Sequence, residues 1–370
     1  QNPTGESQPM VVASDGTVIV DSSGTVVSSL GCNSAYTKYA GYSCPGGKTL
    51  TAGIQEAINY IINTKGGAGG VVCIAPGTYL VQWAYNGVSA NGIYLTSDLG
   101  LTGNITIKGA GMDKTVIQLA PNPNPSMMPN LIGIGGVSNI AIRDLTLLPY
   151  DQDYNPAVTI AMGGVDGLLI DSVHVRGSGQ LTTCTASDGT PYPCVACAPN
   201  HTGSYCTSWG ISNGGVSSNI VVRNSIFELT HAQLNLRYTK NVIVENNIFR
   251  YSLGDHIIVA PGYATYPNCP PSYNVIIRGN TFLFAGDTAI DLSPQQCSGS
   301  PTGYAPGSII NGVIEDNYIE TAGNAILAFG TADMVIRNNT IRQYAGAGNG
   351  ITSGYSAGTP PIIIGNRLYN

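Results

Sequence analysis

A nine-residue phrase recurs five times in the second half of the chain: NIVVRNSIF from Asn219, NVIVENNIF from Asn241, NVIIRGNTF from Asn274, NGVIEDNYI from Asn311 and DMVIRNNTI from Asp333. Two of the intervals between copies are 22 residues, and the others are longer, as loop insertions would make them. A period in this range is typical of a coil of stacked supersecondary units. The sequence therefore predicts a solenoid whose rungs each contain a short strand, a turn and a second strand.

The fifth position of the phrase alternates in charge, reading Arg223, Glu245, Arg278, Glu315 and Arg337. Parallel strands of successive rungs stack about 4.7–4.9 Å apart, so identical charges at this position would repel one another. Opposite charges across two strands contribute about 0.2–1 kcal/mol for each pair. The alternation therefore predicts that consecutive copies of the phrase are neighbours in one parallel sheet.

Two more positions repeat in step with the charges. An asparagine lies two residues after each charged position except the first, at Asn247, Asn280, Asn317 and Asn339, and Asn366 occupies the same place in the last rung. An apolar residue lies two residues further on, at Phe227, Phe249, Phe282, Ile319, Ile341 and Leu368. A buried amide can donate to and accept from its copies above and below. We expect charges outside, an amide ladder at the bend and a hydrophobic column inside.

The same pattern continues on both sides of this stretch. NITIK from Asn104, NIAIR from Asn139 and GLLID from Gly167 precede it, and PPIIIGNRL from Pro360 follows it. Lys108 and Arg143 break the alternation of charge, so these two residues are not expected to be direct neighbours.

The N-terminal part of the chain has a different pattern. Residues 14–29 contain two similar segments, SDGTVIVD and SSGTVVSS, which we interpret as short strands separated by a turn. Thr51–Thr64 spaces its isoleucines as one face of an amphipathic helix, at Ile54, Ile58, Ile61 and Ile62. We expect this helix to plug the N-terminal end of the coil. No equivalent plug follows the last rung, which predicts an open end with unpaired strand edges.

Composition excludes several classes of protein. Only 10% of the 370 residues are charged and the net charge is −6, so the chain offers no basic surface for nucleic acid. The apolar content of 43% argues against disorder. No apolar run approaches the roughly 18 residues that span a bilayer, and Gln1 is expected to begin a processed chain.

Nine cysteines favour an oxidising compartment and hence a secreted protein. Eight fall into groups that allow four disulfides: Cys32 with Cys44; Cys184, Cys194, Cys197 and Cys206 in one insertion at residues 180–210; and Cys269 with Cys297 in equivalent loops. Cys73 is expected to be a small buried hydrophobe. The CxxC pair at 194–197, with His201 nearby, allows a zinc site as the alternative.

Three sequons allow glycosylation of a secreted protein, at Asn104, Asn200 and Asn338. Asn200 lies in the insertion, whereas the other two lie within or beside rung strands. We therefore expect Asn200 to be the preferred site.

The predicted helix is followed by GGAGGVVCIAPGTYLV from Gly66 and by ITIKGAGMDKTVIQL from Ile105. In this order the segments resemble the pectate-lyase-like superfamily of right-handed parallel β-helices, over roughly residues 48–370. The resemblance implies an all-β, single-domain solenoid, preceded by an extension at residues 1–47. It implies no single activity, because the superfamily includes lyases, polygalacturonases, epimerases, tailspikes and non-catalytic surface proteins.

Polar and ionisable residues gather on the third face of three successive rungs. One rung supplies His231, Asn235 and Arg237, the next Asp255 and His256, and the third Asp287 and Asp291. Strand spacing would place them about 5–10 Å apart.

In an enzyme the last four would be catalytic, and the first three would bind an acidic sugar. Arg237 or a calcium ion would stabilise its carboxylate, and no other cofactor is expected. Alternatively, Asp255 and Asp287 each follow a glycine and belong to turn structure. The paired-aspartate, Gly-His-Gly and Arg-Ile-Lys motifs of the polygalacturonases are absent.

An apolar column is expected on the outside of the coil, two residues before the charged position on the same face of the strand. It comprises Val221, Ile243, Ile276, Val313, Val335 and Ile362. Strand propensity or cover by the protein's own loops is one explanation. An interface with a partner is the other.

Two functions follow as hypotheses. The first is an extracellular structural or adhesive protein whose copies join head to tail into filaments, through the N-terminal strands, the open end and the apolar column. The second is a secreted polysaccharide lyase, glycoside hydrolase or epimerase that acts on an acidic polysaccharide. The missing catalytic motifs favour the first.

Overall fold

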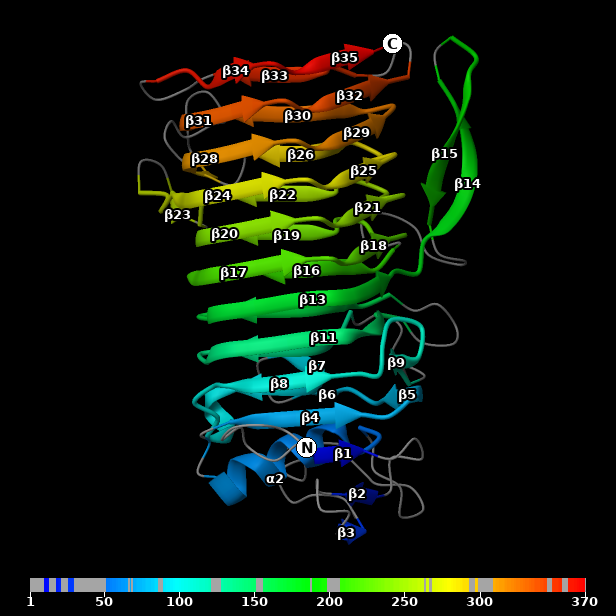
Figure 1. Cartoon of the computed structure of the whole chain (residues 1–370), viewed down its shortest axis with the longest axis vertical. Coiled ribbons are helices and arrows are strands. Elements are labelled where there is room, and N and C mark those ends of the chain that lie inside the picture. Colours follow the sequence, from blue (N-terminus) through cyan, green and yellow to red (C-terminus); the bar gives the residue numbers. More distant parts are fainter. Residues whose placement is uncertain are drawn as a thin grey trace. The chain divides into compact units, whose positions relative to one another are not determined.

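The computed structural model describes most of the chain, with gaps (Figure 1). The described residues are 10–12, 18–20, 26–29, 51–65, 67, 69–85, 89–120, 128–150, 156–186, 188–197, 207–262, 264–265, 268–292, 297–298, 309–344, 348–354 and 359–369. The chain forms two compact units, Gln1–Val175 and Arg176–Asn370, and each is described by itself. The predicted boundary between residues 1–47 and 48–370 stays a prediction.

Parallel strands stack in the first unit in chain order. One ladder joins β4 (Gly70–Ile74), β8 (Ile105–Lys108), β11 (Ser138–Leu148) and β13 (Asp166–Arg176). Beside it, β5 (Gly77–Val81) pairs with β9 (Thr115–Leu119), and β9 pairs with the second half of β11. A second sheet joins β7 (Ala90–Thr96), β10 (Asn130–Gly135) and β12 (Val158–Gly163) in parallel. The antiparallel β6 (Ala84–Tyr85) and the short 3-10 helix η1 (Ser97–Leu99) flank β7.

A helix covers one end of this unit, as predicted. The helix α2 (Ile54–Lys65) buries Ile54, Ile58, Ile61 and Ile62. Its Ile61 packs so closely on β4 that a Cβ on Gly70 would lie 3.0 Å from the Ile61 Cδ1. The Gln55 side chain also accepts from the Tyr94 backbone N–H at 2.7 Å, which ties α2 to β7. The helix begins later than predicted because residues 51–53 form a turn.

Three short N-terminal strands also belong to this unit. They are β1 (Met10–Val12), β2 (Val18–Val20) and β3 (Val26–Ser29). β1 runs parallel to β4 and pairs Val11 with Cys73, while β2 is antiparallel to both β1 and β3. The two predicted strands are confirmed. The expectation that the N-terminal segment pairs with another copy does not hold for β1, which occupies the β4 edge of its own chain.

The expectation that Lys108 and Arg143 are not direct neighbours is wrong. They are register partners in β8 and β11. The like charges are tolerated for a local reason. The Arg143 Nε lies 3.1 Å from an Asp144 carboxylate oxygen, and Asp171 lies opposite Arg143 on the next strand. Carboxylates on both sides of the guanidinium offset the repulsion that the charge pattern alone predicts.

The second unit confirms the register read from the repeated phrase. Its first ladder joins β17 (Ser217–Arg223), β20 (Thr239–Glu245), β24 (Ser272–Arg278), β28 (Ile309–Glu315), β31 (Thr331–Arg337) and β34 (Ile362–Ile364), all parallel. The five alternating charges lie opposite one another in this order. Arg278 and Arg337 form ion pairs of 2.7 and 2.6 Å with Glu245 and Glu315, respectively. At these half-exposed positions each pair contributes at most about 1 kcal/mol.

A short strand follows each strand of the first ladder after a bend. These are β18 (Ile226–Glu228), β21 (Ile248–Arg250), β25 (Thr281–Leu283), β29 (Tyr318–Thr321), β32 (Thr340–Gln343) and β35 (Arg367–Tyr369). The rings of Phe227, Phe249 and Phe282 stack with centroids 5.1 and 5.0 Å apart. The predicted hydrophobic column is confirmed.

The third strand of each rung belongs to a separate parallel sheet. It joins β16 (Trp209–Asn213), β19 (Leu234–Arg237), β22 (Ile257–Ala260), β26 (Thr288–Leu292), β30 (Asn324–Phe329) and β33 (Ile351–Gly354). The chain therefore passes through three strands in each turn, as β20, β21 and β22 show (Figure 1). This is a parallel β-helix, with the right-handed crossover that parallel strands adopt.

Buried asparagines form the predicted ladder at the bend. The Nδ2 of Asn247, Asn280, Asn317 and Asn339 each donates to the Oδ1 of the next asparagine, at 2.9–3.1 Å. Each Nδ2 also donates to a backbone carbonyl, as Asn280 does to Val244 at 2.9 Å. Side chain and bend are thus satisfied together.

A second, exposed asparagine ladder was not predicted. Asn241, Asn274 and Asn311 donate in turn to Asn219, Asn241 and Asn274 at 2.8–3.0 Å. These four residues open the repeated phrase and have left-handed backbones, with φ between 54° and 58°. Asparagine tolerates this conformation better than most residues, which explains its place at the start of the phrase.

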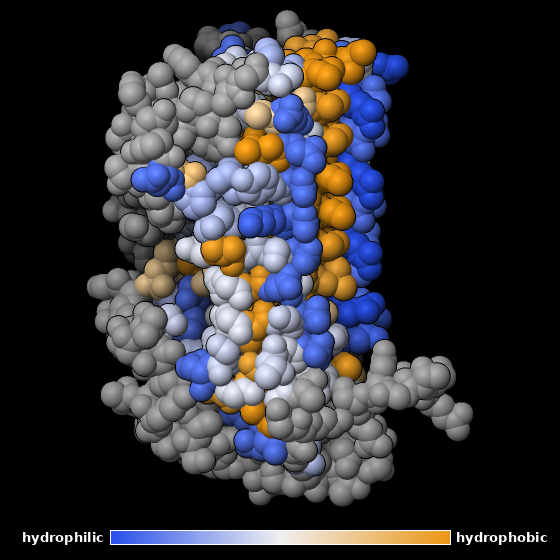
Figure 2. All heavy atoms as spheres, turned by 90° about the vertical axis from the view of Figure 1, so that its left-hand side faces the viewer, coloured by the Kyte–Doolittle hydropathy of each residue, from blue (hydrophilic) through white to orange (hydrophobic). Residues whose placement is uncertain are grey.

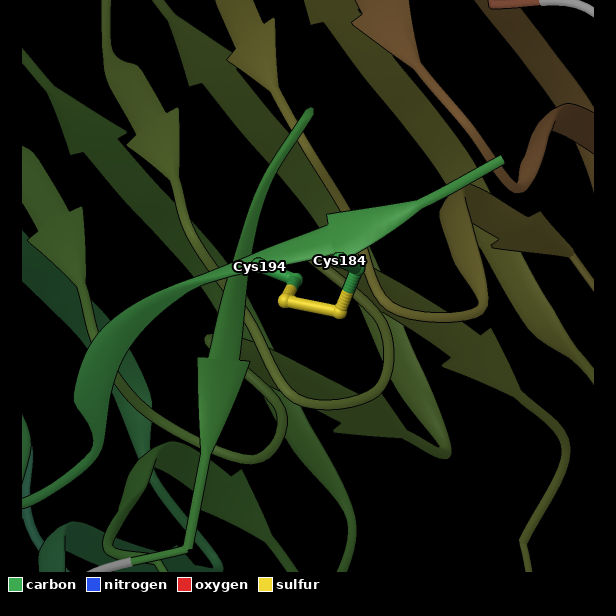
Figure 3. Close-up of a disulfide and its surroundings, with 2 residues drawn as sticks. All are labelled: Cys184 and Cys194. Atoms are coloured by element: carbon green, nitrogen blue, oxygen red, sulfur yellow. A yellow bond between two sulfur atoms is a disulfide. The ribbon is translucent and has the colours of Figure 1, made fainter. Parts of the chain in front are cut away.

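The cysteine-rich insertion contains an antiparallel hairpin, β14 (Gln180–Thr185) and β15 (Pro191–Ala196). Cys184 and Cys194 form a disulfide across it (Figure 3). A zinc site at Cys194 is therefore wrong, because a disulfide sulfur is not a thiolate ligand. Cys197 and Cys269 are also disulfide-bonded.

The remaining cysteines are placed in part. β23 (Ala264–Thr265) pairs with β27 (Cys297–Ser298) in parallel, so these loops do lie on successive rungs. Cys32, Cys44 and Cys206 lie outside the described residues, as does the sequon residue Asn200. Asn104 and Asn338, the other two sequon residues, are exposed.

Cys73 is free, as expected, but it is half-buried rather than buried. It points away from the side of β4 that carries Val72 and Ile74, and burial raises the pKa of its thiol. None of the described helices has the length and hydropathy needed to span a bilayer.

Candidate functional site

Strands β19, β22 and β26 bring two of the predicted site residues into one column. Their apolar residues Leu234, Ile257 and Ile290 are in register and fully buried. The next position reads Asn235, Ile258 and Asp291 and points to the opposite side of the sheet. Asn235 and Asp291 are therefore two strand spacings apart, about 10 Å.

This side of the sheet is polar and nevertheless buried. Asn235, Arg237 and Asp291 are only 5, 8 and 9% exposed. The Arg237 Nε donates to the Asn235 Oδ1 at 3.0 Å, which fixes the guanidinium against β19. Charges held in such surroundings interact more strongly than they do in water.

Asp255 has a strongly raised pKa. Burial first, and then the charges of Asp291 and Asp287, raise this pKa to about 8, against the lowering effect of the Thr288 backbone N–H. That N–H donates to the Asp255 Oδ1 at 3.1 Å. At pH 7 Asp255 is therefore mostly protonated beside two other carboxyl groups. A neutral acid close to a second carboxyl group is the arrangement that acid/base hydrolysis of glycosides requires.

The same aspartates also take part in turn structure, as the alternative interpretation predicted. The Asp287 backbone carbonyl accepts from the Asn324 N–H at 2.8 Å, and its side chain accepts from the Thr288 hydroxyl at 3.3 Å. The preceding glycine is required for close stacking, because a Cβ on Gly286 would lie 2.0 Å from the Leu253 carbonyl oxygen. Hence the Gly-Asp pairs follow from rung geometry, whereas the raised pKa of Asp255 does not.

His256 lies in the hydrophobic interior, so the structure contradicts its predicted catalytic role. Its ring is fully buried, with centroids 6.3 Å from Phe249 and 5.9 Å from Phe282. The Nδ1 lies 2.8 Å from the Gln233 Oε1. Burial lowers the pKa of His256 to about 3, so the ring is neutral at pH 7. His256 lies in the bend just before β22, and this bend turns its ring inward together with the side chain of Ile257.

His231 does lie beside the aspartates. Its ring stacks on Trp209 with the centroids 4.8 Å apart, and burial lowers its pKa. A Cβ on Gly254 would be 3.5 Å from the His231 Nε2, so the ring touches the turn that holds Asp255. The predicted substrate-binding role of His231, Asn235 and Arg237 stays a prediction.

Two residues near this site were missed by the sequence analysis. Trp209 supports His231, and Gln233 holds the interior His256 while its Nε2 donates to the Arg250 carbonyl at 2.9 Å. The chain has only two tryptophans, so the position of Trp209 one rung before His231 was an available signal. Within the described ranges, no group of three or more His, Cys, Asp or Glu residues is placed to hold a metal ion.

Comparison with known proteins gives likeness of fold only. No family model and no curated protein matches the sequence. Among solved structures, the surface protein and adhesin PfbA of Streptococcus pneumoniae is 14% identical, with a TM-score of 0.48, and the match covers 85% of this chain and 93% of that one. The family 28 exopolygalacturonase of Yersinia enterocolitica is 14% identical, with a TM-score of 0.46 and coverage of 95% and 69%.

A third match is the A-module of the mannuronan C-5 epimerase AlgE4 of Azotobacter vinelandii. It is 16% identical, with a TM-score of 0.44 and coverage of 86% of this chain and 91% of that one. At these identities the likeness carries no activity over to this chain. The in-register parallel strands of each unit by themselves identify the fold as a parallel β-helix.

Proposed function

We propose that this chain is a secreted structural protein whose copies join end to end. The observation that supports this proposal is the opening of the core at the last described rung. Ile336 and Ile341 of the preceding rung are 0% exposed, whereas their register partners Ile363 and Leu368 are 45 and 57% exposed. Ile363 and Leu368 therefore form an exposed apolar layer among the described residues.

The strands of this rung have free edges as well. Among the described strands, β33, β34 and β35 each pair with a single neighbour, β30, β31 and β32, respectively. Ile362, Ile364 and Tyr369 add exposed apolar surface of 58, 61 and 51%. Free backbone donors and acceptors beside an apolar layer are a template for another strand.

The complementary edge is offered by the N-terminal strands. β1 is paired on both sides, but β3 pairs with β2 alone among the described strands. Contact between two different ends is heterologous, and a heterologous contact that does not close into a ring extends into a filament. The disulfide between Cys184 and Cys194 supports secretion, because such bonds persist in oxidising compartments.

Placing charge on the open layer should prevent assembly. We expect Ile363→Asp with Leu368→Asp to remain monomeric at concentrations where the unchanged chain forms larger species, because the new carboxylates would have to be buried at the junction. Sedimentation velocity and electron microscopy provide the measurement.

The matched control is Ile248→Asp, since Ile248 is a 38% exposed isoleucine on a middle rung. It should assemble like the unchanged chain. Circular dichroism confirms that all three proteins are folded. Equal assembly of the end variant, or loss of assembly in the control as well, would contradict the end-to-end proposal.

A second function is favoured by the raised pKa of Asp255. We propose as the alternative a hydrolase that acts on an acidic polysaccharide. Asp255 donates its proton to the leaving glycosidic oxygen, and the carboxylate of Asp291 takes a proton from the attacking water. Arg237, fixed by Asn235, pairs with the carboxylate of the sugar.

Activity assays on pectin, alginate and other uronans test this alternative through new reducing ends. Asp291→Asn should lower the rate at least about 100-fold, which is the usual contribution of a positioned acid or base. Asp316→Asn is the control, since Asp316 is an exposed turn residue of the same coil. Absence of activity in the unchanged chain on every uronan, or full activity of Asp291→Asn, would remove the hydrolase.

A further inference from the structure

One side of the second unit carries three parallel columns along the direction in which its rungs stack. The outer columns are the exposed asparagine ladder, which Asp333 continues, and the alternating charges. Between them runs the apolar column, a continuous orange line bordered by blue in Figure 2. Its members are in register on successive strands: Val221, Ile243, Ile276, Val313, Val335 and Ile362. We call this three-column surface the lateral face.

Most side chains of the apolar column are only partly exposed. Ile362 is 58% exposed, but the other five side chains are half-buried between the two polar columns. The column also runs along the rungs rather than across an end. End-to-end contact would therefore leave nearly all of the lateral face uncovered, and its predicted part in a head-to-tail interface is not supported.

We propose that the lateral face pairs with the lateral face of a second copy, with the two coils antiparallel. A pair of identical surfaces is most simply related by a two-fold axis. An axis along the stack would place the charges of one copy opposite the asparagines of the other. An axis along the strands places apolar column on apolar column and charge column on charge column, so it can form several ion pairs between copies, whereas an axis along the stack can form only the pair of Asp333 with Arg337.

The overlap of the apolar columns selects the register of this antiparallel pair. The column has six members, so all of them find a partner only when the axis passes between the rungs of Ile276 and Val313. Ile276 then lies opposite Val313 of the second copy, Ile243 opposite Val335, and Val221 opposite Ile362. Any other axis position leaves at least one apolar residue without an apolar partner.

The charges agree with this register, because an axis between two rungs pairs opposite charges and an axis through a rung pairs like charges. With the axis between these rungs, Arg278 lies opposite Glu315 of the second copy and Glu245 lies opposite Arg337. An axis shifted to the rung of Arg278 would instead place Arg278 opposite itself and Glu245 opposite Glu315. Opposite charges across two strands are favourable and like charges unfavourable. The Arg278 and Arg337 side chains are 48 and 49% exposed, so both can reach across.

The size of the lateral face makes this a weak contact. Six rungs about 4.8 Å apart and three columns about 7 Å apart cover roughly 500 Å² on each copy. The total of about 1,000 Å² lies at the lower limit of specific interfaces. Pairing is therefore expected at high concentration, or where end-to-end assembly brings many lateral faces together.

Cysteine cross-linking tests both the pairing and its register. Ile243→Cys and Val335→Cys are prepared as separate proteins, each at roughly millimolar concentration, and treated with a short bismaleimide alone or as an equal mixture. In the proposed pair, residue 243 of one copy faces residue 335 of the second copy. It lies about 14 Å, three strand spacings, from residue 243 of the second copy. We expect at least about tenfold more cross-linked dimer in the mixture than in either protein alone.

The unchanged chain, which retains the free Cys73, gives the background. More dimer in the single-variant samples than in the mixture would show parallel coils and overturn the proposal. No dimer above background in any sample would overturn the pairing itself. The readout is a denaturing gel, and residues 243 and 335 lie on middle rungs, so failure of end-to-end assembly would not alter the result.

Discussion

Asp255→Asn should stabilise the folded chain by about 4 kcal/mol at pH 7. The folded state holds Asp255 at a pKa of about 8, whereas the unfolded chain has the ordinary value of 3.8. Ionisation of Asp255 is thus disfavoured by burial and by two neighbouring carboxyl groups. Asparagine removes that charge and keeps an oxygen for the Thr288 N–H, which now donates to the Asp255 Oδ1.

The stabilisation should depend on pH in one direction. Because the pKa of Asp255 is higher in the folded state than in the unfolded state, the folded unchanged chain keeps its full stability below pH 3.8. It loses stability as the pH rises from 3.8 to 8. The variant does not titrate at this position, so its advantage should be near zero at pH 3.5 and largest at pH 8. His256 has a lowered pKa of about 3, which costs stability as the pH falls below 6.5, but it is present in both proteins and cancels.

Guanidinium unfolding of both proteins at several pH values measures this difference. Asp316→Asn, which changes an exposed turn residue, is the control and should shift stability by less than about 0.5 kcal/mol. A variant that is less stable than the unchanged chain, or one with an advantage independent of pH, would show that Asp255 is not held neutral. Confirmation would mean that the chain keeps a destabilising carboxyl group, as functional sites often do.

Asn280→Ala should destabilise the second unit by about 3–5 kcal/mol. The Asn280 Oδ1 accepts from the backbone N–H and from the side chain of Asn247, at 2.9 and 3.0 Å. Its Nδ2 donates to the Val244 carbonyl and to Asn317. Alanine would leave several of these buried groups without a partner, and each orphaned group costs about 1–3 kcal/mol.

The control lies six residues earlier on the same rung. Asn274 belongs to the exposed ladder, and Asn274→Gly removes its side chain while glycine keeps the left-handed backbone. Water replaces the lost hydrogen bonds there, so the cost should stay near 1 kcal/mol or less. Thermal and guanidinium unfolding provide the comparison. Equal losses in the two variants would contradict the distinction between a buried ladder and an exposed one.

Much of the rung was predictable because each rung repeats the same environment. Equivalent residues of successive rungs are neighbours and share one environment. An alternating charge and a recurring asparagine at such a position therefore indicate the register of the strands directly. Arg223, Glu245 and Arg278 are neighbours for this reason. The predicted cap at α2 rested on equally simple evidence, since four isoleucines on one face of a helix require an apolar surface to cover.

Features that depend on a single place in the fold were less predictable. Lys108 and Arg143 pair in spite of their like charges because Asp144 folds back onto the arginine. His256 was predicted to be catalytic together with Asp255, but the bend before β22 turns its ring into the interior. The pairing of Lys108 with Arg143 and the inward position of His256 cannot be predicted from the residues that repeat from rung to rung, because each depends on the local neighbours of one residue.

The placement of the candidate site residues was predictable from the sequence, but their chemistry was not. The spacing placed Asp255 on one rung and Asp287 and Asp291 on the next, as they are in the structure. The protonation of Asp255 depends on burial and on the distances among the three carboxyl groups, which only the folded chain determines. The motifs of the polygalacturonases are absent from the sequence, so they could not indicate the roles of these residues.

Electron cryomicroscopy of the 370-residue chain at increasing concentration tests the end-to-end account most directly. It should reveal filaments in which the strand β35 edge of one copy meets the N-terminal strands of the next, with the strand spacing of about 4.8 Å continuing across the junction. Particles that stay single at every concentration, or filaments joined only through other surfaces, would contradict it.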